Sequence, residues 1–115
     1  QILLIQNKEK IYLNEYGPFL VGLRFCESGF NPKAINPNDS DNTPSYGSYQ
    51  YKPKTLLAFG KEYDMIPRNA DLMWAKKNIM DGDLQEKITV GMIEHKVKLS
   101  GQFPSCYKQF GWLLK

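Results

Sequence analysis

The stretch that most constrains the fold is residues 31–51, which read NPKAINPNDSDNTPSYGSYQY. Three prolines, a glycine and many Asn, Asp and Ser residues exclude a regular helix over this length. Loops this long in a compact domain are usually functional or disordered. The aromatic residues Tyr46, Tyr49 and Tyr51 argue against disorder, because such side chains normally pack or bind something. We therefore expect an ordered, functional loop.

Helical spacing flanks this loop on both sides. Pro18 suits a first helical turn, and Leu20, Leu23 and Glu27 fall on one face of a helix over residues 18–28. Gly29 is a typical stop signal for that helix. Before it, the mixed apolar and charged residues 2–13 also indicate a helix.

Further helices are predicted after the loop. One begins near Pro53, and Asn69 is a candidate cap for a short helix that follows. A third begins at an Asp version of a capping box, formed by Asp83 and Glu86, and continues through apolar residues spaced by four: Leu84, Ile88 and Met92. The sequence thus predicts a mainly α fold, a single compact helical domain over residues 1–115 with one long active-site loop.

Composition removes several functional classes. The 115 residues carry a net charge of +3, which favours an anionic partner only weakly. The sequence has no clustered basic stripe, and this counts against a nucleic-acid partner. The longest apolar run, residues 19–23, is too short to span a membrane. His95 is the single histidine, there is no CxxC pair, and no Gly-rich nucleotide-binding motif occurs. We expect no metal, no cofactor and a monomer.

Glu27 is the first candidate for a catalytic residue. It shares the face of Leu20 and Leu23, so it should point inward where the helix meets the polar loop. Burial and the partial negative charge of a helix C-terminus both raise the pKa of a carboxyl group, which keeps a glutamate available as a proton donor near neutral pH. The alternative is a structural glutamate hydrogen-bonded to backbone amides of the loop.

Residues 25–34, FCESGFNPKA, followed by residues 45–50, SYGSYQ, resemble the lytic transglycosylase pattern of lysozyme-like enzymes. In that family an E-S-x-F-N-P-x-A segment precedes a G-L-M-Q-like segment, and the match covers about residues 20–60. The resemblance, which extends to goose-type lysozymes, implies a lysozyme-like α+β domain. Its cleft would cleave the β-1,4 bond between N-acetylmuramic acid and N-acetylglucosamine in peptidoglycan, giving a 1,6-anhydro product.

The resemblance also implies roles for individual residues. Glu27 takes the acid/base role, Ser28 supports its surroundings, Gln50 bonds substrate groups, and Gly47 lets the backbone approach the sugar. Tyr49 replaces the usual methionine, and the family's late A-Y-N-A-G motif is absent, so Tyr107 is the candidate for contacting the glutamate. Sugar rings could stack on the loop tyrosines Tyr46, Tyr49 and Tyr51. Strand-like alternation would put Tyr49 and Tyr51 on one face and Gln50 on the other. The full set of predicted substrate-binding residues is Ser28, Ser45, Tyr46, Gly47, Tyr49, Gln50 and Tyr107, with Tyr51 a further stacking candidate.

Cys26 and Cys106 are the only cysteines. An even count in a cell-wall enzyme permits a disulfide, which would close a loop of about 80 residues; two buried free thiols are the alternative. The resemblance places the protein outside the cytoplasm, as a secreted, periplasmic or cell-wall protein, or on a phage, with peptidoglycan glycan strands as its partner.

Two other functions stay open. Asp39 or Asp41 could activate a water, giving a hydrolysing muramidase, although Asn-Asp-Ser-Asp-Asn is also ordinary turn composition. A calcium site on these aspartates is rejected, because Pro44 and Gln50 occupy the positions that need Gly and Glu. A catalytically silent glycan-binding module is the alternative from a different class.

Overall fold

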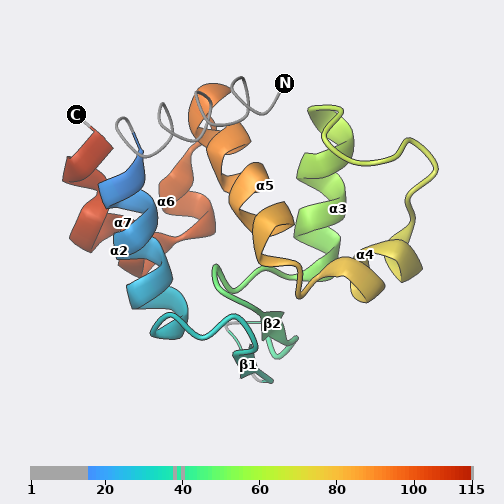
Figure 1. Cartoon of the computed structure of the whole chain (residues 1–115), viewed down its shortest axis with the longest axis horizontal. Coiled ribbons are helices and arrows are strands. Elements are labelled where there is room, and N and C mark those ends of the chain that lie inside the picture. Colours follow the sequence, from blue (N-terminus) through green and yellow to red (C-terminus); the bar gives the residue numbers. More distant parts are fainter. Residues whose placement is uncertain (1–15, 38, 40, 115) are drawn as a thin grey trace, which may run out of the picture.

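The computed structural model describes residues 16–37, 39 and 41–114. Its helices are α2 (Gly17–Ser28), α3 (Pro53–Glu62), α4 (Leu72–Asn78), α5 (Gly82–Glu94), α6 (Leu99–Gln102) and α7 (Pro104–Phe110), followed by the 3-10 helix η1 (Gly111–Leu114). In Figure 1, α5 runs between α2, α6 and α7 on one side and α3 and α4 on the other. The predicted mainly α single domain is confirmed, while the helix expected over residues 2–13 lies outside the described residues.

Helix α2 begins and ends where local chemistry predicts. Pro18 lies in its first turn, and Gly29 follows its last residue with φ 61°, a left-handed conformation that glycine adopts without strain. The N–H of Gly29 donates to backbone carbonyls of the last turn. The inward face carries Phe19, Leu20 and Leu23, all buried, and packs against α7. This packing fixes the direction of the stripe that ends at Glu27.

The starts of α4 and α5 correct two predicted caps. Asp71, not Asn69, caps α4, because its carboxylate accepts the N–H of Trp74. Asp81 caps α5 by accepting the N–H groups of Asp83 and Leu84, so the capping box predicted at Asp83 is wrong. Asp and Asn are about equally good N-cap residues. Local preference therefore does not decide between two candidate helix starts that lie two residues apart.

The predicted loop is ordered and non-helical in its described part. Strand β1 (Ile35–Asn36) pairs antiparallel with β2 (Ser45–Tyr46). Tyr46 and Tyr51 then exchange backbone hydrogen bonds around a tight turn in which Gly47 and Gln50 both have positive φ. The predicted strand-like alternation of Tyr49, Gln50 and Tyr51 is therefore wrong, because a turn occupies those positions.

The core lies around α5. Ile88 and Met92 of this helix are fully buried, as their spacing predicted, and they share one cluster with Leu56, Tyr51 and Phe103. The hairpin lies at one end of the molecule, beyond the end of α2 and the start of α5 (Figure 1). Among the described helices, none is long and apolar enough to cross a bilayer.

Candidate active site

Glu27 lies in the last turn of α2, on the inward face that carries Leu20 and Leu23, and its side chain is partly buried. Burial, with a further contribution from the negative charge of Asp39, raises the pKa of Glu27 from 4.5 to about 7. Within the described part of the chain, no hydrogen bond or ion pair holds this carboxylate. The alternative of a structural glutamate bonded to loop amides thus has no support there, and about half of the carboxyl groups carry a proton at pH 7.

The predicted disulfide between Cys26 and Cys106 is confirmed. It joins α2 to α7 across a sequence separation of 80 residues, with the two Cα atoms 5.7 Å apart. A carboxylate oxygen of Glu27 and both sulfur atoms lie within 4.8 Å of one another. These three residues are the one group of potential metal ligands in the described ranges, and in the oxidised protein the bonded sulfurs offer no thiolate.

The two aspartates of the loop have different surroundings. Asp39 accepts a hydrogen bond from the buried hydroxyl of Ser45, lies 3.8 Å from the Nζ of Lys52, and acts electrostatically on Glu27. Asp41 accepts from the Nζ of Lys52 at 2.7 Å and from the backbone and hydroxyl of Thr43, which hold its pKa well below the usual range. Asp39 is thus the aspartate whose charge acts on Glu27, and Asp41 closes a local turn.

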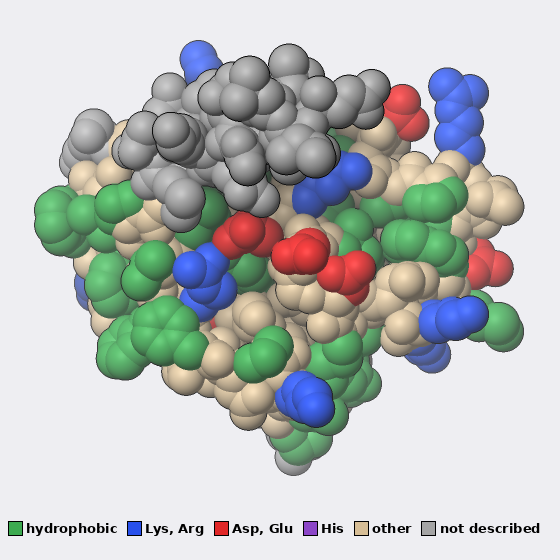
Figure 2. All heavy atoms as spheres, in the orientation of Figure 1, with side chains coloured by type: hydrophobic (Ala, Val, Ile, Leu, Met, Phe, Trp, Pro, Cys, Tyr) green, Lys and Arg blue, Asp and Glu red, His purple; other side chains and the backbone are tan. Residues whose placement is uncertain are grey.

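An ion pair that the sequence reasoning missed lies one turn before Glu27. The Nη1 of Arg24 donates to Glu86 of α5 at 2.6 Å and to the hydroxyl of Tyr49 at 2.9 Å. The same Tyr49 hydroxyl donates to Glu86 at 3.0 Å. In Figure 2, acidic side chains lie beside basic ones in the middle of the visible face, in keeping with charges that pair across elements.

Two of the tyrosines predicted to stack on sugar rings are buried instead. Tyr49 is 1% exposed and Tyr51 is 0% exposed, so neither ring presents a face to a substrate. The hydroxyl of Tyr51 lies 2.8 Å from that of Thr89. The stacking prediction is corrected for both residues, because the tight turn directs their side chains into the core. Tyr46 is only partly buried and keeps part of its surface open.

A buried glutamine on α5 organises the turn. The Nε2 of Gln85 donates to the carbonyls of Tyr46 at 2.8 Å and Ile79 at 2.6 Å, and its Oε1 accepts the N–H of Tyr49 at 2.9 Å. A Cβ added at Gly47 would lie 2.5 Å from this Nε2. Gly47 is therefore needed for close approach to Gln85 as well as for its φ of 82°, a physical reason different from the predicted approach to a sugar.

The remaining predicted residues are placed as follows. The Nε2 of Gln50 donates to the carbonyls of Ala34 and Gly47, so its amide N–H groups face the loop. The hydroxyl of Ser28 donates to the carbonyl of Arg24 within α2. These bonds occupy polar groups that the resemblance assigned to the substrate or to the glutamate.

Tyr107 does not reach the glutamate. Its ring packs edge-on against Phe19, with the ring centres 6.2 Å apart, and against the backbone of Gly111. Phe19 precedes Glu27 by two helical turns, which is about 12 Å along the axis. The predicted contact is corrected: the α7 residue beside Glu27 is Cys106, through its disulfide.

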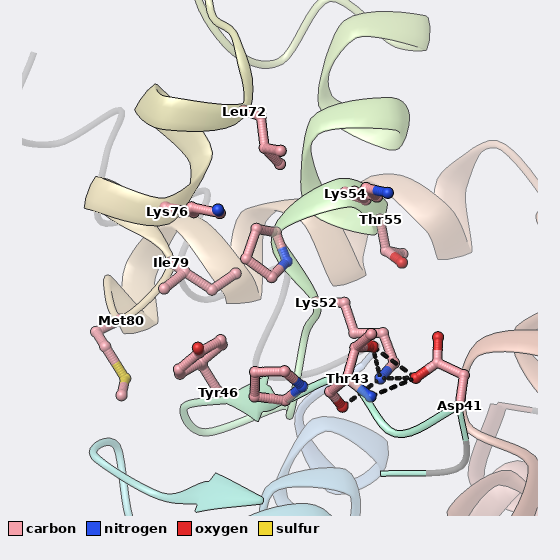
Figure 3. Close-up of a pocket in the computed structure, with 12 residues that line it drawn as sticks. Asp41, Thr43, Tyr46, Lys52, Lys54, Thr55, Leu72, Lys76, Ile79 and Met80 are labelled. Atoms are coloured by element: carbon pink, nitrogen blue, oxygen red, sulfur yellow. Dashed lines mark hydrogen bonds and ion pairs between the residues drawn. The ribbon is translucent and has the colours of Figure 1, made fainter. Parts of the chain in front are cut away.

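A groove of about 690 Å³ lies next to Asp39 and Lys52, between the hairpin, the start of α3 and the end of α4. Figure 3 shows Leu72, Lys76, Ile79 and Met80 on one side and the hydrogen-bonded cluster of Asp41, Thr43 and Lys52 on the other. Tyr46 lies at the floor between them in this view. Glu27 does not line the groove. Asp39 relates the two, because its charge acts on Glu27 and it lies 3.8 Å from the Nζ of Lys52, which lines the groove.

Comparison with known proteins adds no family assignment. No family model matches the chain. No curated protein matches it. No solved structure matches it either.

Proposed function

We propose that this protein is a peptidoglycan-cleaving glycosidase that acts by lytic transglycosylation, with Glu27 as the acid and base. The observation that carries the proposal is the state of Glu27. Its carboxyl group is partly buried, has no hydrogen-bond partner within the described residues, and has a pKa of about 7. Such a group holds a proton near neutral pH and can release it to a leaving oxygen.

The reaction would proceed in two steps. The protonated Glu27 donates its proton to the glycosidic oxygen as the bond to the anomeric carbon of N-acetylmuramic acid breaks. The resulting Glu27 carboxylate then removes the proton from the 6-hydroxyl of the same sugar while that oxygen bonds to the anomeric carbon. The products are a 1,6-anhydro sugar and a free hydroxyl on N-acetylglucosamine, and Glu27 regains its proton, so no cofactor and no water are consumed.

The substrate also fits the surroundings of the site. The disulfide between Cys26 and Cys106 is a bond that persists in oxidising compartments, and the peptidoglycan wall lies outside the cytoplasm. The net charge of +3 suits an anionic wall. The motif match over residues 20–60 supplies the expectation of this particular glycan.

Asp39 favours one second candidate, a hydrolysing muramidase. Its charge acts on Glu27, and its carboxylate is oriented by the hydroxyl of Ser45. Hydrolysing glycosidases usually use a pair of carboxyl groups. One protonates the leaving oxygen, and the other activates a water or attacks the sugar. Asp41 is a weaker candidate for that role, because Lys52 and Thr43 both donate to its Oδ1 and draw the carboxylate into a local turn.

Digestion of purified peptidoglycan, followed by product mass spectrometry, tests the proposal. We expect 1,6-anhydro-muropeptides from wild type and a loss of activity of about 10²-fold or more in Glu27→Gln. Asp39→Asn should retain anhydro products, and Asp41→Asn is its matched control in the same loop. Products with reducing ends alone, lost in Asp39→Asn but not in Asp41→Asn, would establish the hydrolase instead.

The same digest decides against a silent binding module. A binding module would sediment with peptidoglycan but release no soluble fragments at any protein concentration. Glu27→Gln should still sediment with peptidoglycan, since the substitution removes the proton and keeps the size of the side chain. Binding by both proteins with no release by either would refute an enzymatic function.

A further inference from the structure

We propose that the groove beside Asp39 binds the carboxylate-bearing peptide stem of peptidoglycan, so that the enzyme prefers peptide-substituted glycan to bare glycan. This inference rests on the proposed function and adds a specificity site to it. The groove is separate from Glu27 but adjacent to its surroundings, because Asp39 acts on Glu27 and lies 3.8 Å from Lys52 at the groove wall. A substituent of the glycan held at Glu27 could therefore enter it.

The charges of the groove are unevenly compensated. Lys52 is neutralised, because it pairs with Asp41 at 2.7 Å and with Asp39 at 3.8 Å. Lys54 and Lys76 also line the groove, are exposed, and have no ion pair or hydrogen bond with any other described residue. The wall made by α3 and α4 thus carries two uncompensated positive charges that an anionic ligand would complement.

Figure 3 shows how these charges lie. Lys76 extends from α4 toward the start of α3, above Ile79 and Tyr46, whereas the Lys52 and Asp41 cluster lies at the lower right of the view. The surface around Lys76 is otherwise apolar, formed by Leu72, Ile79 and Met80. A ligand suited to this side has a carboxylate for Lys76 and small aliphatic groups for the neighbouring surface.

A peptide stem fits this description better than a sugar ring does. N-acetylglucosamine is neutral and would leave Lys54 and Lys76 without a counter-charge. Stem peptides carry free carboxylates and short aliphatic side chains, and they branch from the muramic sugar whose bond is to be broken. The groove volume of about 690 Å³ lies within the range of sites that enclose small ligands.

The test compares two substrates and two variants. The substrates are glycan strands with their peptide stems and the same strands stripped of peptides by an amidase. The variants are Lys76→Glu, in the groove, and Lys77→Glu, the next residue of α4, which is exposed and does not line the groove. We expect Lys76→Glu to lower kcat/KM about tenfold on peptide-bearing strands, since an attraction is replaced by a repulsion.

The same variant should leave cleavage of stripped strands unchanged, and Lys77→Glu should leave cleavage of both substrates unchanged. Equal effects of Lys76→Glu on both substrates, or equal effects of the two variants, would overturn the groove proposal while leaving the catalytic one intact. Cleavage of neither substrate by wild type would instead refute the proposed function.

A binding measurement decides the groove proposal even in that case. An isolated acidic stem tetrapeptide is titrated into isotopically labelled Glu27→Gln protein, and the backbone amide shifts of α4 and of the hairpin are followed. Shifts at Lys76 and Tyr46 that are lost in the double variant Glu27→Gln/Lys76→Glu support the proposal. The absence of shifts at both positions at millimolar peptide overturns it.

Discussion

The raised pKa of Glu27 predicts a pH-dependent cost to stability that Glu27→Gln removes. The unfolded chain loses the Glu27 proton near pH 4.5, whereas the folded protein keeps it up to about pH 7. Between these values the folded state binds more protons than the unfolded state, so stability must fall as pH rises. The cost is absent below pH 4.5, grows between pH 4.5 and 7, and is complete above pH 7.

The magnitude follows from the same two values. The difference between 4.5 and about 7 corresponds to at most about 3.4 kcal/mol, at about 1.36 kcal/mol for each tenfold change in proton affinity. Because the side chain is only partly buried, water screens its charge, and we expect about 1–2 kcal/mol. For a domain of this size that is about 4–8 °C in melting temperature.

The assay is thermal unfolding of wild type and Glu27→Gln, with the disulfide intact, at intervals from pH 4 to pH 9. We expect the melting temperature of the variant, relative to wild type, to rise by about 4–8 °C across this range. Taking the difference cancels groups that titrate alike in both proteins, and Glu62→Gln, at an exposed position of α3, controls for the loss of a glutamate. A difference that stays constant from pH 4 to pH 9 would show that Glu27 is not desolvated.

Three further predictions concern the frame of the site. Reduction of Cys26–Cys106 should lower the free energy of unfolding by up to about 4.5 kcal/mol, measured by urea unfolding with and without reductant; unchanged midpoints would contradict it. Gln85→Leu should cost about 3 kcal/mol in the same assay, because three backbone groups, two of them buried, lose their partner. Gly47→Ala should cost about 2 kcal/mol or more, whereas Gly101→Ala, at an open site, should cost under about 0.5 kcal/mol; equal costs would be inconsistent with the close approach.

Local chemistry made the helices and the position of Glu27 predictable. Pro18 and Gly29 bound α2 through backbone preferences that depend on the residue itself, and the spacing of Leu20, Leu23 and Glu27 directs all three inward. The disulfide followed from the even cysteine count together with the compartment that the motif match implies. None of these inferences required knowledge of which distant segments meet.

The errors about Tyr49 and Tyr107 came from long-range contacts. Tyr49 sits in a polar, proline-rich stretch, but its hydroxyl bonds to Arg24 and Glu86, 25 residues before and 37 after it, and it is buried. Tyr107 is likewise directed to Phe19 by the packing of α7 on α2. No period or motif in the chain records such pairings, so neither the burial of Tyr49 nor the placement of Tyr107 was predictable.

The consecutive residues Gln85 and Glu86 explain how α5 sets the geometry of the site. Because successive side chains on a helix diverge by about 100°, the two can serve different neighbours. Gln85 holds the turn through backbone groups at Tyr46 and Tyr49, and Glu86 holds Arg24, one turn before Glu27. The β1–β2 hairpin, whose loop contains Asp39, and helix α2, which carries Glu27, are thus both fixed to α5. The Glu27–Asp39 arrangement should therefore depend on these two α5 residues, although neither would itself contact the reacting bond.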